Sequence, residues 1–233
     1  MHMDGMKLTH RAFSPQFWTT LAITFAIAGG AGCSGFSGTT AASFLRKIEE
    51  SPDPNARYEA YDKLARPNCY DSEQQKLGAT RVLIAKLEAG KEPVATRAVI
   101  CKTLGELRAR NAREALLKAT GDAEGVVRVQ ACLALGKVGL PEDATALARV
   151  MTVDVLEDCR IAAIEGLGEL KSPDPRIVEV LINGMEHDDP AIRLASVESL
   201  RETTGEDLGL ESAPWRRWLQ SQVAAASVPP VRR

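Results

Sequence analysis

Apolar residues recur along most of the chain at the three- and four-residue spacing of amphipathic helices. The clearest instances are five segments that align without gaps: 55–65, 95–105, 126–136, 158–168 and 191–201. Each contains an arginine followed seven residues later by a leucine; the arginines are Arg57, Arg97, Arg128, Arg160 and Arg193. Counted from the arginine, positions −1, +3, +4 and +7 share one face of a helix. The pattern therefore predicts five helices that each bury one side.

A second helical segment precedes each of these five. The preceding segments are 41–50, 74–90, 111–120, 143–151 and 175–185. Helix-start signals separate them, such as the tetrapeptide SPDP at 51–54 and again at 172–175, because proline favours the first helical turn. The sequence has no alternating strand pattern. Since a single helix pair buries its apolar faces only by stacking on neighbours, the sequence predicts an all-α fold, an α-solenoid of about five helix pairs over residues 41–203.

The repeated pattern acid-x-x-x-Arg-x-x-Ala-x-x-x-Leu-Gly resembles HEAT-like repeats of the phycobilisome-lyase type over residues 40–203. The resemblance implies right-handed stacking of antiparallel pairs, with the second helices on the concave face. It also implies that the repeat arginines are structural and pair with acids at the starts of their own helices, since a partly buried guanidinium needs such a partner. Those acids are Asp53, Glu92, Glu124 and Asp189, with Asp154, Glu157 and Asp158 as alternatives in the fourth unit.

The C-terminal segment 204–224 departs from the repeat. Ser212 is expected to cap a helix that Pro214 begins, with Trp215, Trp218 and Leu219 on one face. We expect this helix to close the exposed side of the last repeat, the alternative being an aromatic patch for a partner. Residues 225–233 are expected to form a disordered tail.

The N-terminal 32 residues have the features of a targeting signal. Lys7 and Arg11 precede an apolar run at 17–28, which is too short to span a bilayer and suits a secretory signal. The sequence GAGC at 30–33 resembles the lipobox of bacterial lipoproteins, although Gly30 stands where that family usually has leucine. The resemblance implies acylation of Cys33; ordinary cleavage near Ala31 and an uncleaved anchor are the alternatives.

This reading gives a lipoprotein signal peptide at 1–32 and a flexible tether at 33–40. It places the protein in the bacterial cell envelope, lipid-anchored on the periplasmic face of the inner or outer membrane.

Composition narrows the classes of function. The chain has 233 residues, is 45% hydrophobic and carries a formal net charge of −2, so no nucleic-acid partner is expected. His187 is the only histidine beyond the first ten residues. A histidine-based catalytic or metal site is therefore not expected, and the loop around His187 is interpreted as helix-capping, with a cation site as the alternative. No metal or other cofactor is expected.

The cysteines divide into two groups in the repeat pattern. Cys101, Cys132 and Cys159 occupy apolar repeat positions and are interpreted as small buried side chains. Cys69 lies in an irregular connection and is the candidate reactive thiol. Since no CxxC pair occurs, a zinc or redox role is not expected.

Positions +5 and +9 of the repeat are expected to face the concave groove. From the second unit onward they are Lys102 and Glu106, Leu133 and Lys137, Glu165 and Glu169, and Glu198 and Glu202. The groove is therefore expected to become acidic toward its C-terminal end. Two interpretations remain open: a solvated charged face, and a groove that binds a basic segment of a protein.

The function predicted from these features is a membrane-tethered, non-enzymatic scaffold that binds a protein partner on the concave face. The alternative is an enzyme, because proteins that resemble this one include lyases that attach bilin. A third reading is a subunit of a larger complex.

Overall fold

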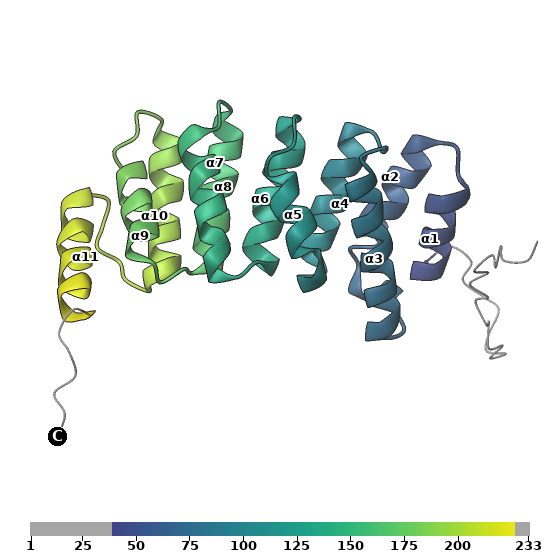
Figure 1. Ribbon diagram of the computed structural model, residues 1–233, viewed down its shortest axis with the longest axis horizontal. Helices are drawn as coiled ribbons and strands as arrows, with labels where there is room; N and C mark the ends of the chain where they lie inside the picture. The colour runs from purple at the N-terminus through teal and green to yellow at the C-terminus, as the bar shows by residue number, and fades with distance from the viewer. Residues whose placement is uncertain (1–38, 227–233) are drawn as a thin grey trace, which may run out of the picture. The chain divides into compact units, whose positions relative to one another are not determined.

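The structure is a computed structural model that describes residues 39–226, and every regular element in this part of the chain is helical. The helices form five consecutive pairs that follow one another in chain order (Figure 1). They are α1 (Ala41–Glu50) and α2 (Pro54–Lys63), α3 (Glu73–Ala89) and α4 (Val94–Glu106), α5 (Arg113–Ala119) and α6 (Gly125–Val138), α7 (Ala144–Val153) and α8 (Glu157–Leu170), and α9 (Pro175–Gly184) and α10 (Pro190–Thr204). A last helix, α11, spans Ser212–Ala226. The predicted all-α solenoid is confirmed.

The second helices of the pairs form one continuous layer. Helix α4 packs between α2 and α6, and α8 packs between α6 and α10. The first helices lie on the other side of this layer, each against its own partner, as in α5 on α6 and α7 on α8. The exposed side of the second helices is called the second-helix face below.

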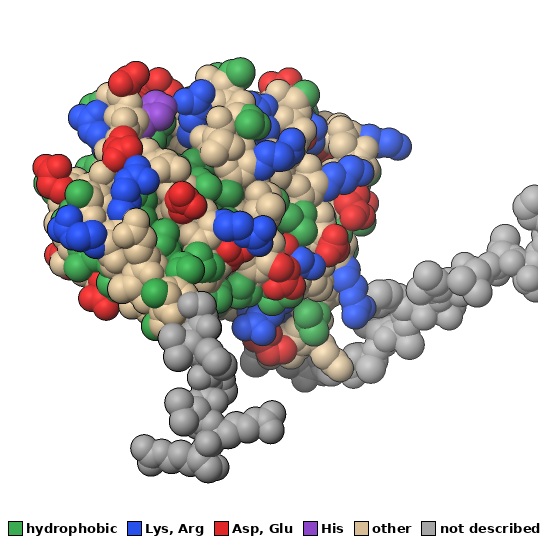
Figure 2. All heavy atoms as spheres, turned by 60° about the vertical axis from the view of Figure 1, so that its left-hand side comes forward, with side chains coloured by type: hydrophobic (Ala, Val, Ile, Leu, Met, Phe, Trp, Pro, Cys, Tyr) green, Lys and Arg blue, Asp and Glu red, His purple; other side chains and the backbone are tan. Residues whose placement is uncertain are grey.

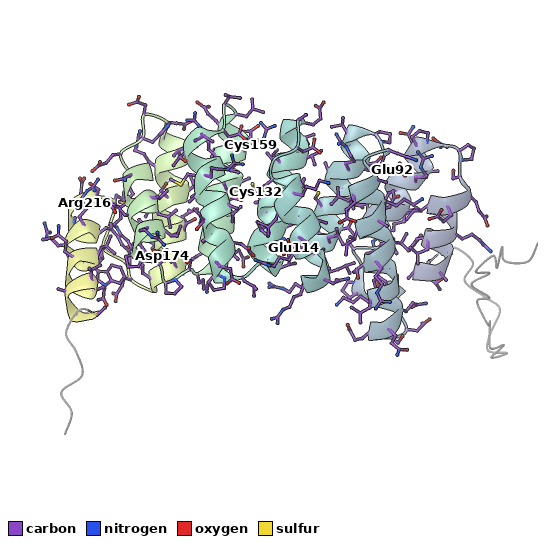
Figure 3. The ribbon with its side chains drawn as sticks, in the orientation of Figure 1. Glu92, Glu114, Cys132, Cys159, Asp174 and Arg216 are labelled. Atoms are coloured by element: carbon purple, nitrogen blue, oxygen red, sulfur yellow. The ribbon has the colours of Figure 1, made fainter. Side chains whose placement is uncertain are left out.

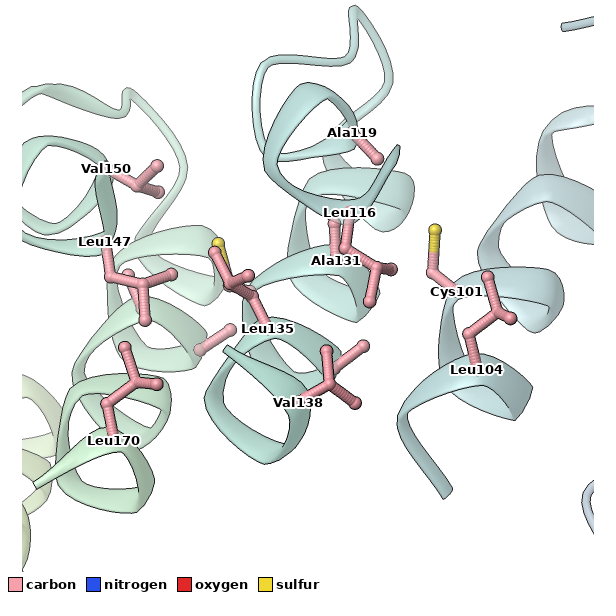
Figure 4. Close-up of a cluster of buried hydrophobic side chains, with 14 of the residues drawn as sticks. Cys101, Leu104, Leu116, Ala119, Ala131, Leu135, Val138, Leu147, Val150 and Leu170 are labelled. Carbon is pink, nitrogen blue, oxygen red and sulfur yellow. The ribbon is translucent and has the colours of Figure 1, made fainter. Parts of the chain in front are cut away.

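The core lies between the two layers and follows the leucine register of the sequence. All five leucines at position +7 are completely buried: Leu64, Leu104, Leu135, Leu167 and Leu200. Figure 4 shows part of this core, where Leu104, Leu116, Leu135 and Leu147 come from four successive helices. Burying a leucine side chain stabilises the fold by about 1.5–3 kcal/mol. The leucine that recurs in the sequence therefore makes the same stabilising core contact in each helix pair.

Adjacent second helices approach one another backbone to backbone where glycines replace larger side chains. A Cβ atom added to Gly136 on α6 would lie 2.7 Å from the Cα of Gly166 on α8. No real side chain tolerates that distance without a backbone shift. The two glycines therefore set the spacing between these helices and keep the second-helix face continuous.

The two SPDP tetrapeptides begin helices in the same way. In each, the aspartate is the N-cap and its Oδ1 accepts the backbone N–H two residues later, at 2.9 Å, from Asn55 to Asp53 and from Arg176 to Asp174. The proline that follows has no N–H and fits the first turn.

Helix α11 packs against α9 and carries its aromatic face inward. Trp215 is completely buried and its Nε1 donates to the carbonyl of Gly209 at 3.0 Å. Trp218 and Leu219 pack against the core beside it. Ser212 does not cap the helix from outside: it is the first helical residue, and its Oγ donates to Glu186 of the preceding pair.

The predicted signal peptide (1–32), Cys33 and most of the expected tether lie outside the described residues, as does nearly all of the expected tail. Across residues 39–226, the helices are too short or too polar for any of them to cross a bilayer.

Candidate functional site

The repeat arginines bind the neighbouring repeat. The guanidinium of Arg57 donates to Oε2 of Glu92 at 3.1 and 3.3 Å, and Glu92 lies in the loop between the helices of the next pair. Arg97 donates from NH1 to Asp122, in the loop of the next pair, at 3.0 Å. Arg128 is equivalent again and binds Asp154. The result is a ladder of ion pairs along the edge where the loops within the pairs lie; Figure 3 shows Glu92 at this edge and Asp174 at the opposite one.

The prediction that each arginine pairs with an acid of its own helix start is therefore wrong. Asp53 and Asp189 accept backbone N–H groups of their own helices as N-caps, Glu124 occupies an N-cap position, and Glu92 binds Arg57 rather than Arg97. Asp154 was one of the alternatives for Arg160 in the fourth unit, but its carboxylate binds Arg128 of the third.

The physical reason is that carbonyl groups, not carboxylates, bind four of the five arginines at their own helix starts: Arg57, Arg128, Arg160 and Arg193. NH1 of Arg57 donates to the carbonyls of Ser51 and Pro52, six and five residues earlier. Arg193 binds the carbonyls at the same two offsets. In Arg57 and Arg128, the remaining nitrogens Nε and NH2 then bind a carboxylate in the loop of the next pair.

The fourth rung of the ladder holds a histidine in place of the carboxylate. Arg160 NH1 lies 3.3 Å from His187 Nε2, while Nδ1 of His187 accepts the backbone N–H of Asp189 at 3.0 Å. Asp122 and Asp154 accept the N–H two residues later in the same way. Because Nδ1 acts as an acceptor, a neutral ring carries its proton on Nε2, which faces another donor. The fourth rung thus lacks a charge-assisted hydrogen bond.

A second contact between repeats lies on the opposite side of the solenoid and was not predicted from the sequence. Arg113 at the start of α5 donates from Nε and NH2 to the two oxygens of Asp143, each at 2.6 Å. Asp143 is buried and also accepts the N–H of Leu140 at 2.8 Å. The one feature of the sequence that could have indicated this contact is the separation of 30 residues between Arg113 and Asp143, which is close to the repeat length.

The four described cysteines are buried. Cys132 and Cys159 lie on neighbouring second helices inside the stack (Figure 3). Cys69, expected to be the reactive thiol, is only 5% exposed, and burial raises its pKa. That expectation is wrong, because the connection containing Cys69 folds onto the core instead of lying open. Over residues 39–226, no three side chains of His, Cys, Asp or Glu are grouped to hold a metal ion.

The predicted groove residues separate into two sets. Lys137, Glu165, Glu169, Glu198 and Glu202 line one hollow of about 430 Å³ on the second-helix face, between α6, α8 and α10. Lys102 is not part of it: on α4, its Nζ binds Asp62 of α2 at 2.9 Å. Partial loss of hydration in the hollow, followed by the charges of Glu198 and Glu202, raises the pKa of Glu165. The acidic end of the groove is therefore a physical cluster in which like charges repel.

An apolar hollow adjoins the acidic one and was not predicted. It has a volume of about 380 Å³ and is lined mainly by Val126, Val129, Leu133, Leu156 and Ile161. Leu133 and Glu165 line both hollows, which are therefore contiguous. Val126 is 51% and Leu156 46% exposed, so this surface is open to solvent. The face shown in Figure 2 carries charged side chains of both signs.

Comparison with known proteins agrees with the fold. A family model described as HEAT repeats matches residues 80–168 and 154–213. Among solved structures, the complex of CpcE and CpcF of phycocyanin lyase from Nostoc sp. PCC7120 is similar, with a TM-score of 0.60 and 20% identity over 86% of this chain and 75% of that chain. No curated protein matches. The resemblance to HEAT-like repeats of the phycobilisome-lyase type is thus confirmed.

The structural likeness also corrects one expectation. The chain was predicted not to be an enzyme because no catalytic constellation is legible in its sequence. The similar solved structure is a lyase complex on the same kind of solenoid. The expectation that the chain is not an enzyme is therefore withdrawn, since this kind of solenoid occurs in a lyase complex.

Proposed function

The chain belongs to the HEAT repeat family, and from that premise we propose that it is a protein-binding solenoid whose partner lies on the second-helix face. This is the face expected to be concave. The observation that carries the proposal is the pair of contiguous hollows across α6, α8 and α10. Exposed apolar surface beside uncompensated charge is typical of an interaction site.

The charge of this face favours a basic segment of the partner. Glu165, Glu169, Glu198 and Glu202 are all exposed on two neighbouring helices. Lysine or arginine side chains brought by a partner relieve the repulsion among these carboxylates and speed the encounter at low ionic strength.

The experiment is site-specific photo-cross-linking from position 198 in the full-length chain, expressed in its native cell envelope. A photo-reactive residue at 198 should capture a discrete partner, and the capture should weaken when Glu202 is replaced by lysine. The matched control places the photo-reactive residue at the exposed Glu179 on α9, on the other layer. Capture from 179 but not from 198 would overturn the proposed binding face.

We propose further that a lipid on Cys33 holds the solenoid at the bacterial envelope. The support is the GAGC sequence behind a short apolar run and ahead of the SGFSGTT segment at 34–40. Mass spectrometry of the mature N-terminus tests this: an acylated cysteine at position 33 is expected, and an unmodified chain that begins elsewhere contradicts it.

A lyase-like role is the second candidate, and its support is the likeness to the CpcE and CpcF complex of phycocyanin lyase. In that reading the second-helix face holds the acceptor protein or a companion subunit. Absorbance of the purified chain after addition of bilin, with and without an acceptor protein, tests it. A bound or transferred chromophore is the expected result, and an unchanged spectrum in both samples rejects this role.

A further inference from the structure

The second-helix face carries two parallel rows of side chains across three neighbouring helices. The apolar row consists of the residues at position +1 of the repeat: Val129 on α6, Ile161 on α8 and Leu194 on α10. None of the three is buried, and Leu194 is 54% exposed. The acidic row consists of the glutamates at positions +5 and +9 on α8 and α10, which are Glu165, Glu169, Glu198 and Glu202.

The acidic row lacks cationic partners of its own. Within residues 39–226, none of its four glutamates forms an ion pair, whereas ion pairs occur from α1 to α11 elsewhere. Lys137 is the one basic residue that lines the acidic hollow. The row therefore presents an excess of negative charge beside an exposed apolar surface.

The spacing of the rows matches the width of a helix. Each residue rises 1.5 Å along a helix, so position +1 lies about 6 Å from position +5 and about 12 Å from position +9, and a helix with its side chains is about 10–12 Å wide. Three neighbouring helices packed about 8–10 Å apart extend over roughly 16–20 Å. A helix of about 11–14 residues covers that length.

Backbone hydrogen bonding also favours a helical segment of the partner over an extended one. The second helices satisfy their own backbone N–H and C=O groups, so this face offers no free edge with which an extended strand can pair. A helical segment satisfies its own backbone and brings side chains of two kinds to its two flanks.

Building on the proposed function, we infer that the occupant is an amphipathic, basic helix of the partner protein. It lies across α6, α8 and α10, with its apolar flank on the apolar row and its lysines and arginines on the acidic row.

The test uses the full-length protein and a synthetic 14-residue amphipathic peptide with leucines along one flank and lysines along the other. The control peptide has the same composition with leucines and lysines interchanged so that neither flank is uniform. Titration at low salt, followed by fluorescence anisotropy, should show at least about tenfold tighter binding of the amphipathic peptide. Circular dichroism should show that this peptide gains helicity when bound.

Variants at exposed positions locate the binding without unfolding the chain. The double variant Glu198→Lys with Glu202→Lys should weaken peptide binding about tenfold or more, and Leu194→Ser about threefold. The matched controls Glu179→Lys on α9 and Leu77→Ser on α3 should leave it unchanged, since both side chains are exposed away from the rows. Equal binding of the two peptides, or binding that the Glu198 and Glu202 reversal leaves unaltered, overturns the inference.

Failure of this inference and failure of the proposed function give different results. If photo-cross-linking from position 198 captures a partner whose attached segment is extended or lacks basic residues, the helical occupant is wrong while the binding face stands. If position 198 captures nothing and the amphipathic peptide does not bind, both are rejected.

Discussion

Arg128 of the third helix pair binds Asp154 of the fourth through two parallel hydrogen bonds, from Nε to Oδ2 at 2.7 Å and from NH2 to Oδ1 at 2.8 Å. Its third nitrogen, NH1, donates to the carbonyls of Asp122 and Ala123. The two side chains are only 14% and 8% exposed, so solvent screens the pair weakly. A bidentate pair in such surroundings is among the stronger polar contacts of a protein.

Replacing Asp154 by asparagine should lower the free energy of unfolding by about 2 kcal/mol, because the carboxylate charge is lost and only one of the two oxygens that accept from Arg128 remains. Asparagine keeps an oxygen for the N–H of Leu156, which Asp154 Oδ1 accepts at 3.0 Å, so the local turn survives. Urea unfolding followed by circular dichroism gives the difference. The control is Arg176→Gln, which removes a pair in which the arginine is 86% exposed and should change nothing measurable. Equal effects of the two variants would contradict this prediction.

The same pair should make stability depend on acidity. The hydrogen bonds from Arg128 hold the pKa of Asp154 below its ordinary value of 3.8. The unfolded chain therefore binds a proton at a higher pH than the folded one, and the contribution of the pair is complete above that ordinary value. It falls as the pH drops from there through the lower pKa of the folded state. The stability difference between the wild type and Asp154→Asn should be constant from about pH 7 to about pH 5 and shrink as the pH falls below about 4; a difference that stays constant below pH 4 would be inconsistent with this account.

Replacing His187 by aspartate should stabilise the solenoid. At the equivalent positions, Asp122 and Asp154 each bind an arginine of the preceding repeat and the N–H two residues later. An aspartate at 187 can do both for Arg160 and for the N–H of Asp189, which we expect to add about 1 kcal/mol at pH 7. Thermal unfolding measures it. His187→Ala is the comparison variant, and a gain as large with alanine would mean that removal of the ring, not completion of the ladder, is responsible.

Replacing Gly136 by alanine should destabilise the fold by about 1–3 kcal/mol, in spite of the higher helix propensity of alanine. The added Cβ meets the backbone of Gly166, and backbone cannot rotate away as a side chain does. Gly78→Ala on α3 is the matched control: nothing lies within 4 Å of its Cβ position, so the same change there should stabilise by about 0.5–1 kcal/mol. Chemical denaturation of both variants checks the opposite signs.

The described thiols should be inert in the folded protein. Burial raises the pKa of Cys101 and of Cys132 to about 12, and it raises those of Cys69 and Cys159 as well. Since the thiolate is the reactive form, a Cys33→Ser chain should not react with a thiol reagent at pH 8 until urea unfolds it. Rapid reaction of one thiol under native conditions would point to local opening around that residue.

The helices and their register were legible in the sequence because both are local. Five arginines, each with a leucine seven residues later, marked the second helices, and every one of those leucines is fully buried. Segment 41–50 coincides with α1 for the same reason, since its apolar residues repeat at helical spacing.

The partners of the arginines were not legible, because they depend on how repeats stack. Arg57 and Glu92 are 35 residues apart, and Arg128 and Asp154 are 26 apart. Those separations vary with loop length. An acid four residues before an arginine is easy to see in the sequence, but Asp53 and Asp189 at that position bind the backbone of their own helices and not the arginine.

The acidic part of the candidate binding face was predicted from the sequence, and the apolar part was not. The offsets +5 and +9 located the glutamates of α8 and α10, because helical geometry fixes which face such positions share. Lys102 follows the same offset, but Asp62 on the neighbouring helix binds it. The apolar row was missed because a valine or isoleucine at +1 has the same appearance in a sequence as a core residue, and only exposure separates the two.

The ladder has a direction, and the direction coincides with the order in which the chain is synthesised. Each described rung joins an arginine to a loop that follows it by 25 to 35 residues. On the ribosome, each of the first four repeats therefore emerges with a guanidinium whose partner has not yet been made. The loop of the following repeat supplies that partner, and so each of these four repeats is held in place by the one translated after it.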